Sequence, residues 1–563
     1  MQRSCSKRSF ETGNREQGTG NRKQGTGNRE QGTGKKFYFV TCDHRSLIRR
    51  RFNDSTIQRF NDSTIQRFND STIQRFNDST IRQINHKPSI STTAAKWIFY
   101  ILLLTGVAFR FDQWWDARDI FLDEANLLRN IYDRGFLELL LPLYHDQFAP
   151  VGYLWLLKLA TLIFPATEFG LRTLPFLISM ATLLVFAKWI YKSVGYTAGI
   201  WALGAFIAGG LFLRYSVEIK QYGLDMLATV SLLYLYSSYR ENRSSRTLFT
   251  LILAGWIAIF FSMPSIFILA GIGIAEFFTQ EKISTVTKPV IAMATWLGAF
   301  GLNFIFFLRH GISDGGLQQY HENYFLGADL VNNFKLINTL IYSSTGHTVI
   351  AIAVGWLLLL AGWTFLYKEK KWLLLSSLFL VLGPLLASLT HHYSLIPRLL
   401  LFTLPVVLVV QAHTFSWIQK RYAKAALPAV IIWCLLVIPG SGNWSYITGK
   451  LTIDEYQQPL ELLAKRNDST EIYVHHHAWP GVSFYMEFSD AHERYQDLPV
   501  VKGKWQDWQD GEIPRELRSR PVYLLIVHMG KDEKDDIMAR VRETGQMETI
   551  WENPEGDAIL YFP

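Results

Sequence analysis

The feature of this sequence that most constrains its fold is a series of long apolar runs. Between Trp97 and about Pro439, runs of about 15–22 mostly apolar residues alternate with short polar or charged breaks. A bilayer core about 30 Å thick requires a helix of about 20 apolar residues. Runs such as 349–366 and 399–411 are apolar on every face, whereas a soluble chain would show amphipathic periods. The pattern therefore predicts an all-α polytopic membrane bundle.

We expect about 11 membrane-spanning helices in this bundle. They cover residues 97–111, 170–190, 197–213, 222–238, 248–261, 264–279, 289–307, 346–367, 372–389, 399–418 and 424–440. A further apolar segment, 151–164, is short and lies between Pro150 and Pro165. If this segment does not span, every loop rich in lysine and arginine falls on one side, which the positive-inside rule makes cytoplasmic. We therefore expect 151–164 to be an interfacial or re-entrant helix within the first outer loop.

This assignment fixes the expected topology in the cell (inner) membrane. The N-terminus is cytoplasmic, and several loops share the outer face with the C-terminal tail: 112–169, the turn near 214–221, 309–345 and 390–398. The tail is soluble in composition and is expected to form a small extracytoplasmic α/β domain. Its expected elements are helices near 453–465 and 532–544 and strands near 471–476, 522–527 and 558–562.

The N-terminal part of the chain differs from the rest. Residues 12–32 repeat the unit TGNREQG with a period of 7, and residues 52–81 repeat RFNDSTIQ with a period of 8. Neither unit has enough apolar content to bury a core, so we expect a disordered tail. The expected domains are therefore a repeat-containing tail (1–95), a transmembrane domain (96–440) and the extracytoplasmic α/β domain (441–563).

Charge and cysteine content narrow the classes of partner. The net charge of +8 reflects lysines and arginines in cytoplasmic loops, so we expect membrane lipids and no nucleic acid as partners. Cys5, Cys42 and Cys434 form neither a disulfide framework nor a metal-ligand spacing. The membrane part also lacks a glycine-rich phosphate loop.

Acidic residues in the outer loops are candidates for chemistry. Asp123 and Glu124 begin a short expected helix, where a carboxylate either caps the helix or acts as a general base toward an alcohol acceptor. Glu218 and Lys220 lie at the mouth between two expected spans. They are either a solvated pair or a second acidic group with a lysine placed near a phosphate. Asp225 lies about one turn inside the next span, where an ionisable residue usually faces a cavity or a partner.

Basic residues and histidines form a second group of candidates. Arg398 lies at the expected outer surface of the bilayer, where it either binds a lipid phosphate bidentately or serves as a snorkelling anchor. His391 and His392 are candidate metal ligands, but two adjacent histidines without a carboxylate are weak evidence for a metal site. The run 475–477 is three histidines in an expected surface strand, where alternation would point them to different faces. We therefore assign no metal ligands and no certain cofactor, and leave a divalent cation open.

Several passages together resemble the GT-C superfamily of polytopic glycosyltransferases. Within this superfamily, the chain is most similar to the protein O-mannosyltransferase-like enzymes, the lipid A aminoarabinose transferase and the rhizobial lipopolysaccharide-core transferases. The passages are LDEANLLRNI (122–131), HDQFAPVGYLWLLKL (145–159), EFGLRTLPFLISM (168–180), YSVEIKQYGLDML (215–227) and PRLLLF (397–402). They look like the family's first acidic motif, its proline-containing segment, the start of its next span, its second acidic motif and a later arginine-containing motif.

The resemblance implies roles for individual residues. Asp123 would be the catalytic carboxylate with Glu124 beside it, and Glu218 the second acidic residue. Arg398 and Lys220 would hold the donor phosphate. The remaining substrate-binding residues would be His145, Gln147, Pro150 and Tyr222. The chain departs from the family at Ala149, where many members have a second proline, and at Lys220–Gln221, where many carry an arginine, which leaves the donor's identity open.

The resemblance also implies the reaction. A hexosyl- or pentosyl-type transferase would move a sugar, with inversion, from a polyprenyl-phosphate donor to a hydroxyl of a glycan, lipid or protein at the outer face. In this mechanism loop 309–345 would fold over the donor, since its stretch 311–327 is polar and contains glycines, as a mobile cover would. One alternative is a transporter or flippase of lipid-linked glycans, which should show internal repeats and broken helices. Another is an inactive relative that only binds such a glycan.

Overall fold

The protein is described here from a computed structural model. The structure describes residues 90–280, 287–309, 320–346, 348–440, 454–466, 468–508, 513–554 and 556–563. The expectations for the repeats of 1–89, for the first part of the cover at 311–319 and for the beginning of the tail at 441–453 lie outside these residues. Helix α3 (Ile90–Trp115) begins at Ile90, and the expected division into domains stays a prediction.

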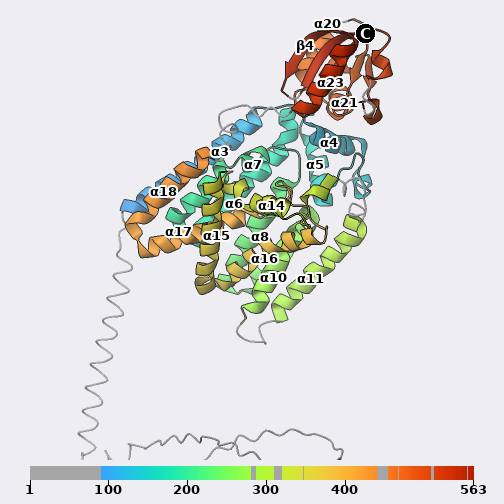
Figure 1. Ribbon diagram of the computed structural model, residues 1–563. Coiled ribbons are helices and arrows are strands. Elements are labelled where there is room, and N and C mark those ends of the chain that lie inside the picture. Colours follow the sequence, from blue (N-terminus) through green and yellow to red (C-terminus); the bar gives the residue numbers. More distant parts are fainter. Residues whose placement is uncertain are drawn as a thin grey trace, which may run out of the picture. The chain divides into compact units, whose positions relative to one another are not determined.

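Long apolar helices dominate the part of the chain before Gly440 (Figure 1). Among the residues that the structure describes, five helices are long and apolar enough to cross a membrane: Thr93–Trp115, Glu168–Ala208, Thr287–Leu308, Val349–Glu369 and Lys371–Leu389. Apolar side chains on these helices point outward, and Leu104, Leu297 and Leu386 are 68%, 67% and 60% exposed. A water-facing surface would rarely carry so many. The protein is therefore a multi-pass membrane protein, and the expected count of 11 spans stays a prediction.

The other helices of this region are shorter or carry more polar residues. They are α7 (Gly210–Arg214), α8 (Tyr222–Asn242), α9 (Ser245–Phe261), α10 (Ser265–Phe278), α17 (Leu404–Arg421) and α18 (Ala423–Gly440). Besides α3, the helices that supply the five candidate spans are α6 (Glu168–Ala208), α11 (Thr287–Asn303) with the π-turn η3 (Phe304–Leu308), α15 (Val349–Glu369) and α16 (Lys371–Leu389). Two expectations need correction: α17 begins at Leu404 and not at 399, and the expected loop 309–345 contains helix α14 (Leu330–Thr345).

Helix α6 corresponds to two expected spans. Its backbone is broken at Gly195, whose φ of 77° is a conformation that residues with a side chain rarely adopt. The break falls in the expected loop between 190 and 197. The two predicted helical segments are thus present, and they meet at this glycine.

The first outer loop folds into short elements, as expected. These are α4 (Leu122–Asp133), the 3-10 turn η1 (Glu138–Leu140) and α5 (Val151–Ile163). Helix α5 confirms a helix at the expected segment 151–164, with Pro150 as its N-terminal cap residue. Its interfacial placement remains a prediction.

The expected grouping of loops by side agrees with the contacts between them. At one end, Lys192 pairs with Glu241, and the Lys370 amine donates to the Ser193 carbonyl. At the other end, Arg398 pairs with Asp123, and Leu395 N–H donates to the Tyr324 carbonyl. Loops that were assigned to the same face of the membrane therefore lie together.

The C-terminal region is a small α/β unit with a five-stranded sheet of order β2-β1-β3-β5-β4. Its strands are β1 (Ile472–Val474), β2 (Val500–Lys502), β3 (Val522–Ile526), β4 (Gln546–Asn553) and β5 (Gly556–Phe562). Strand β1 pairs in parallel with β2 and β3, and β5 pairs antiparallel with β3 and β4. The helices of this unit are α20 (Gln457–Arg466), α21 (Trp479–Glu487), α22 (His492–Tyr495) and α23 (Lys531–Thr544), and its 3-10 turns are η5 (Trp505–Trp508) and η6 (Arg515–Leu517). A further 3-10 turn, η4 (Glu322–Tyr324), precedes α14 in the helical region.

The sequence predicted β1, β3, β5, α20 and α23 near their observed positions, but missed β2, β4 and α21. The expected strand 471–476 is too long, because β1 ends at Val474 and the chain then turns. The three histidines that follow therefore lie in a turn and not in a surface strand.

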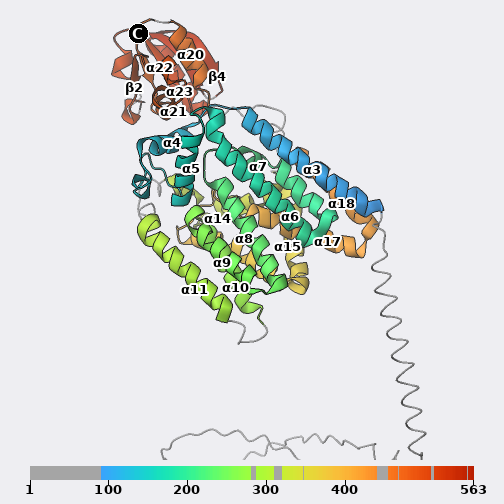
Figure 2. The same ribbon diagram turned by 180° about the vertical axis from the view of Figure 1, so that it is seen from behind.

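One apolar core joins the C-terminal unit to the first outer loop. It contains Leu127 of α4, Tyr153 of α5, Tyr456 before α20 and Val482 of α21, all fully or almost fully buried. Figure 2 shows α21 beside α4 and α5 at one end of the helical region. Helices α4 and α5 of the expected first outer loop therefore pack against the C-terminal unit.

Candidate active site

The candidate site is built around the first turn of α4. This helix begins directly after Phe121 and carries Asp123 and Glu124 in its first turn, where the helix dipole favours negative charge. Successive helical residues are about 100° apart around the axis, so the two carboxylates point in different directions. The structure gives them different surroundings.

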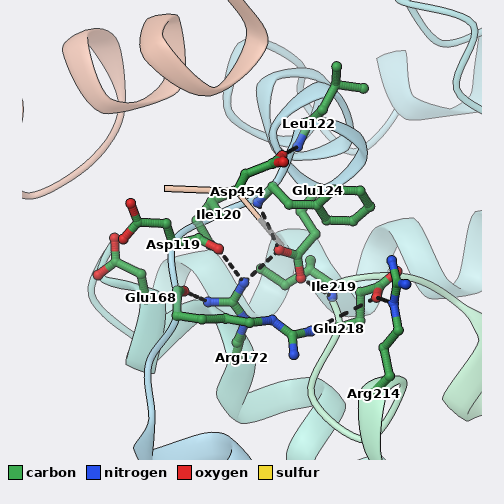
Figure 3. A network of polar contacts seen from close by, with 12 residues as sticks. Asp119, Ile120, Leu122, Glu124, Glu168, Arg172, Arg214, Glu218, Ile219 and Asp454 are labelled. Atoms are coloured by element: carbon green, nitrogen blue, oxygen red, sulfur yellow. Dashed lines mark hydrogen bonds and ion pairs between the residues drawn. The ribbon is translucent and has the colours of Figure 1, made fainter. Parts of the chain in front are cut away.

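Glu124 is fully buried, and both of its carboxylate oxygens accept hydrogen bonds (Figure 3). Its Oε2 accepts from Arg172 Nη2 at 2.6 Å and from Phe121 N–H at 3.1 Å. Its Oε1 accepts from Ile219 N–H at 2.8 Å. The carboxylate thus connects α4 to the start of α6 and to the loop before α8.

Arg172 is the centre of this buried network. Its side chain is 0% exposed, and it also donates to the carbonyls of Arg118 and Asp119. The sequence analysis assigned no role to Arg172. Its signal was its place inside an expected span, where a charged residue requires an acidic partner.

Glu218, the expected second acidic residue, lies in an adjoining buried group. Its Oε2 is 3.1 Å from Arg214 Nε and 3.9 Å from Arg118 Nη2, and the residue is 2% exposed. Burial raises the pKa of Glu218 although Arg214 opposes this. Arg118 and Arg214, which the sequence analysis also left without a role, hold this carboxyl group away from solvent.

Asp123 faces a different and partly open group. Its side chain is 26% exposed, and its Oδ2 is 3.5 Å from Arg398 Nη1. Burial alone would raise the pKa of Asp123, but Lys220 and Arg398, with a hydrogen bond from Gln147, hold it below the usual value. Asp123 is therefore a carboxylate beside two cations.

Lys220 and Gln147 connect two of the expected motifs. Lys220 Nζ donates to Gln147 Oε1 at 2.6 Å, and Gln221 Nε2 donates to the Phe148 carbonyl at 3.3 Å. Lys220 is 9% exposed, and this burial lowers its pKa although Asp123 opposes the effect. The proline-containing segment and the second acidic motif thus lie side by side next to Asp123.

Arg398 brings in two tyrosines. Its Nη2 donates to the Tyr320 hydroxyl at 3.1 Å, and Tyr222 lies within its electrostatic range. Tyr222 is buried and packs edge-on against Tyr215, with ring centroids 5.1 Å apart. Tyr320 comes from the expected cover region, and the sequence analysis had not singled it out.

The remaining expected residues surround this group at more distance. Pro150 is buried and lines a cavity of about 60 Å³ together with Gln147, Val151 and Phe307. His145 lies on an exposed turn at φ 62°, and its carbonyl accepts from Gln147 Nε2 at 3.1 Å. Within the described part of the chain, the His145 ring makes no contact with Asp123, Lys220 or Arg398.

The C-terminal unit reaches the first turn of α4 directly. The buried Asp454 accepts from Leu122 N–H at 3.1 Å and lies 2.9 Å from His528 Nδ1. His528 also lies within the electrostatic range of Asp123. Asp119 accepts from the backbone N–H groups of Tyr456 and Gln457 at 2.6 and 2.8 Å. The sequence did not reveal the contacts of Leu122 with Asp454 and of Asp119 with Tyr456, because these partners are more than 330 residues apart.

Comparisons with known proteins add a distant likeness. No protein-family model matches the chain. No curated protein matches it. Among solved structures it is similar to ArnT from Cupriavidus metallidurans bound to undecaprenyl phosphate, with 10% identity over 83% of this chain and 98% of that chain and a TM-score of 0.48. The apo state of that ArnT gives 11% identity, the same coverage and a TM-score of 0.47.

A second kind of solved structure also matches. The Archaeoglobus fulgidus oligosaccharyltransferase in complex with Zn and sulfate shows 13% identity over 82% of this chain and 72% of that chain, with a TM-score of 0.43. All three TM-scores are below 0.5, so these likenesses define no family for the chain.

The arrangement at Asp123 defines what chemistry is available. An exposed carboxylate edge can accept a proton from a hydroxyl group. Arg398 and Lys220 beside it can bind phosphate oxygens through charge-assisted hydrogen bonds. The site therefore places a partly open carboxylate beside two cationic side chains, at the end of the bundle that carries the C-terminal unit.

Proposed function

We propose that the protein is a GT-C-type glycosyltransferase that takes its sugar from a polyprenyl-phosphate donor. The observation that carries this proposal is the placement of Asp123 within 3.5 Å of Arg398 and within reach of Lys220, with part of the carboxylate open. The three residues come from three separate loops.

The donor phosphate would bind to Arg398 and Lys220. The buried Lys220 already lies next to Gln147, and Arg398 has a hydrogen bond to Tyr320 that fixes the orientation of its guanidinium group. The prenyl chain would lie along the apolar surface of the bundle. The apolar part of the cavity beside Gln147 and Pro150 belongs to the same region.

Asp123 would act as the general base. It takes the proton of the acceptor hydroxyl as the hydroxyl oxygen bonds to the anomeric carbon, and the bond from that carbon to the phosphate oxygen breaks. The sugar is transferred with inversion, and polyprenyl phosphate leaves. In the free protein the two cations lower the pKa of Asp123, and a bound phosphate would offset their effect and make the carboxylate more basic when the donor is present.

Glu124 and Glu218 have a different role in this proposal. Both are buried and bonded to arginines, so neither reaches a substrate in the described structure. We assign them as positioning residues, which fix α4 against α6 and against the loop that carries Lys220. Of the three carboxylates that the sequence suggested for catalysis, Asp123 alone keeps a catalytic role here.

The proposal places this site at the outer face of the inner membrane, with the N-terminus in the cytoplasm. The domain division at residues 95 and 440 and the acceptor class, whether a glycan, a lipid or a protein, belong to the same proposal. The positive-inside rule supports the orientation, because the clusters of lysine and arginine lie at the end opposite to Asp123.

A donor screen tests the function. The purified protein is offered several polyprenyl-phosphate sugars with candidate acceptors, and release of polyprenyl phosphate is measured. Asp123→Asn should abolish release, whereas Asp133→Asn, the same change at the exposed end of the same helix, should leave it intact. Equal release from the Asp123 variant would remove the base from the mechanism. Movement of intact donor across vesicles without release would favour a flippase.

A further inference from the structure

A cluster of three histidines lies outside the candidate active site, in the turn between β1 and α21. His475, His476 and His477 follow the last residue of β1. The chain turns here because the N–H groups of Ala478 and Trp479 both donate to the His475 carbonyl, at 2.9 and 3.1 Å. The turn brings three successive side chains together, whereas a strand would have alternated them.

The rings of this cluster are in contact. The ring centroids of His475 and His476 and those of His476 and His477 are 4.1 Å apart, and those of His475 and His477 are 5.2 Å apart. One ring nitrogen from each residue can be chosen so that all three atoms lie within 4.8 Å of one another.

The ring nitrogens are buried, and most have no hydrogen-bond partner among the described residues. These atoms are Nε2 of His475, both ring nitrogens of His476 and Nδ1 of His477. His475 itself is 0% exposed. Buried polar atoms of folded proteins nearly always have a partner, so four such atoms in one turn indicate a ligand.

The surroundings suit a cation. The Trp505 ring covers His476 edge-on, with centroids 4.8 Å apart. The carboxylates of Asp507 and Glu533 act electrostatically on His476 and His477.

We propose that His475, His476 and His477 bind one divalent transition-metal ion of the Zn²⁺ type, through one ring nitrogen each. Imidazole nitrogen is a preferred ligand of zinc, copper and nickel, and three histidines leave a fourth position for water or another ligand. His475 Nδ1 accepts a long hydrogen bond of 3.3 Å from His477 N–H. Metal binding through His475 Nε2 therefore moves the ring proton to Nδ1 and opens that contact.

The proposed metal site is separate from the transferase proposal but adjoins the same end of α4. His477 packs 6.5 Å, ring to ring, from His528, which is bonded to Asp454. Asp454 in turn accepts from the first N–H of α4. The ion would thus lie next to the link between the C-terminal unit and the helix that carries Asp123.

Metal binding to the full-length protein tests this proposal without any activity assay. The protein is purified in detergent, stripped with a chelator and titrated with Zn²⁺ alone by calorimetry, and Co²⁺ is added to a second sample to record its visible absorption. We expect one ion per chain. The double variant H476Q/H477Q should lose affinity by on the order of 100-fold or more, because two of three ligands are gone. It should also lose the cobalt band of a nitrogen-rich site.

A matched control separates a built site from general histidine binding. The variant H391Q/H392Q changes the other adjacent pair, which is exposed at the end of α16, and should bind like the unchanged protein. Thermal unfolding without metal shows whether H476Q/H477Q is folded, and the single variant H476Q replaces it if it is not. The absence of binding in the unchanged protein, or equal binding in the histidine variant, would overturn the proposal, whatever the outcome of the donor screen.

Discussion

Two neighbouring carboxylates of α4 should respond in opposite ways to the same substitution. Asp123→Asn is expected to remove transfer and to leave the fold intact. Glu124→Gln is expected to destabilise the fold. The contrast follows from the surroundings of the two side chains, since they are adjacent in sequence and share one helix turn.

The magnitudes follow from burial and partners. The Asp123 side chain is 26% exposed and has one ion pair at 3.5 Å, which contributes about 0–1 kcal/mol. Loss of a general base slows a reaction by about 10²–10⁴-fold. Glu124 and Arg172 are both 0% exposed at 2.6 Å. Neutralising one partner of such a pair leaves a buried charge and costs about 3–5 kcal/mol.

Two assays on the same preparations separate these effects. Transfer is measured as release of polyprenyl phosphate at saturating donor, and stability as the thermal unfolding midpoint in detergent. Asp123→Asn should unfold at nearly the same temperature as the unchanged protein, and Glu124→Gln should unfold well below it. The reasoning is refuted if Glu124→Gln is as stable as the unchanged protein, or if Asp123→Asn transfers at the full rate.

Further predictions concern the same region. Arg398→Met should raise the KM for the donor by about 10–100-fold through loss of charge-assisted hydrogen bonds, and Arg398→Lys should restore only part of it, as donor titrations would show. Because its pKa lies below the ordinary 3.8, Asp123 should remain ionised down to about that pH, so it should add no acid limb to the pH profile of kcat/KM between about pH 5 and 8. Lys220→Met removes one of the two cations and should raise the pKa of Asp123, which moves its acid limb to higher pH. Profiles of kcat/KM extended below pH 5 would show this shift, and a limb at the unchanged position would contradict the assigned pairing. Asp119→Ala removes the acceptor for two backbone N–H groups at the start of α20 and should speed proteolytic release of the C-terminal unit, which gel electrophoresis would follow.

The helices were largely predictable because their cause is local. An apolar run of bilayer length favours a helix wherever it occurs, since each backbone group must be bonded within the segment. Helix α5 and the break at Gly195 also fell where the sequence suggested. Helix α14 was missed, because it lies in the expected loop 309–345. The glycines and polar residues of that loop made the whole segment look irregular.

The C-terminal unit was harder to predict. Strands β2 and β4 were missed, since strand pairing depends on partners elsewhere in the chain. The histidine turn shows the same limit. Alternation along a strand was the natural prediction for 475–477, and the end of β1 at Val474 reversed it. Three histidines that were expected on different faces lie together.

By itself, the sequence determined that this is a chain of membrane helices, with acidic residues at the start of a short helix between two of them and with basic residues in later loops. The tertiary structure decided which acid is available. Glu124 accepts from Arg172 and Ile219, which lie 48 and 95 residues further along the chain, whereas Asp123 faces Arg398 and remains partly open. Adjacent helix positions differ by about 100° around the axis. Two carboxylates that are neighbours in the sequence therefore differ in environment, because Glu124 is buried in an ion pair and Asp123 remains partly accessible.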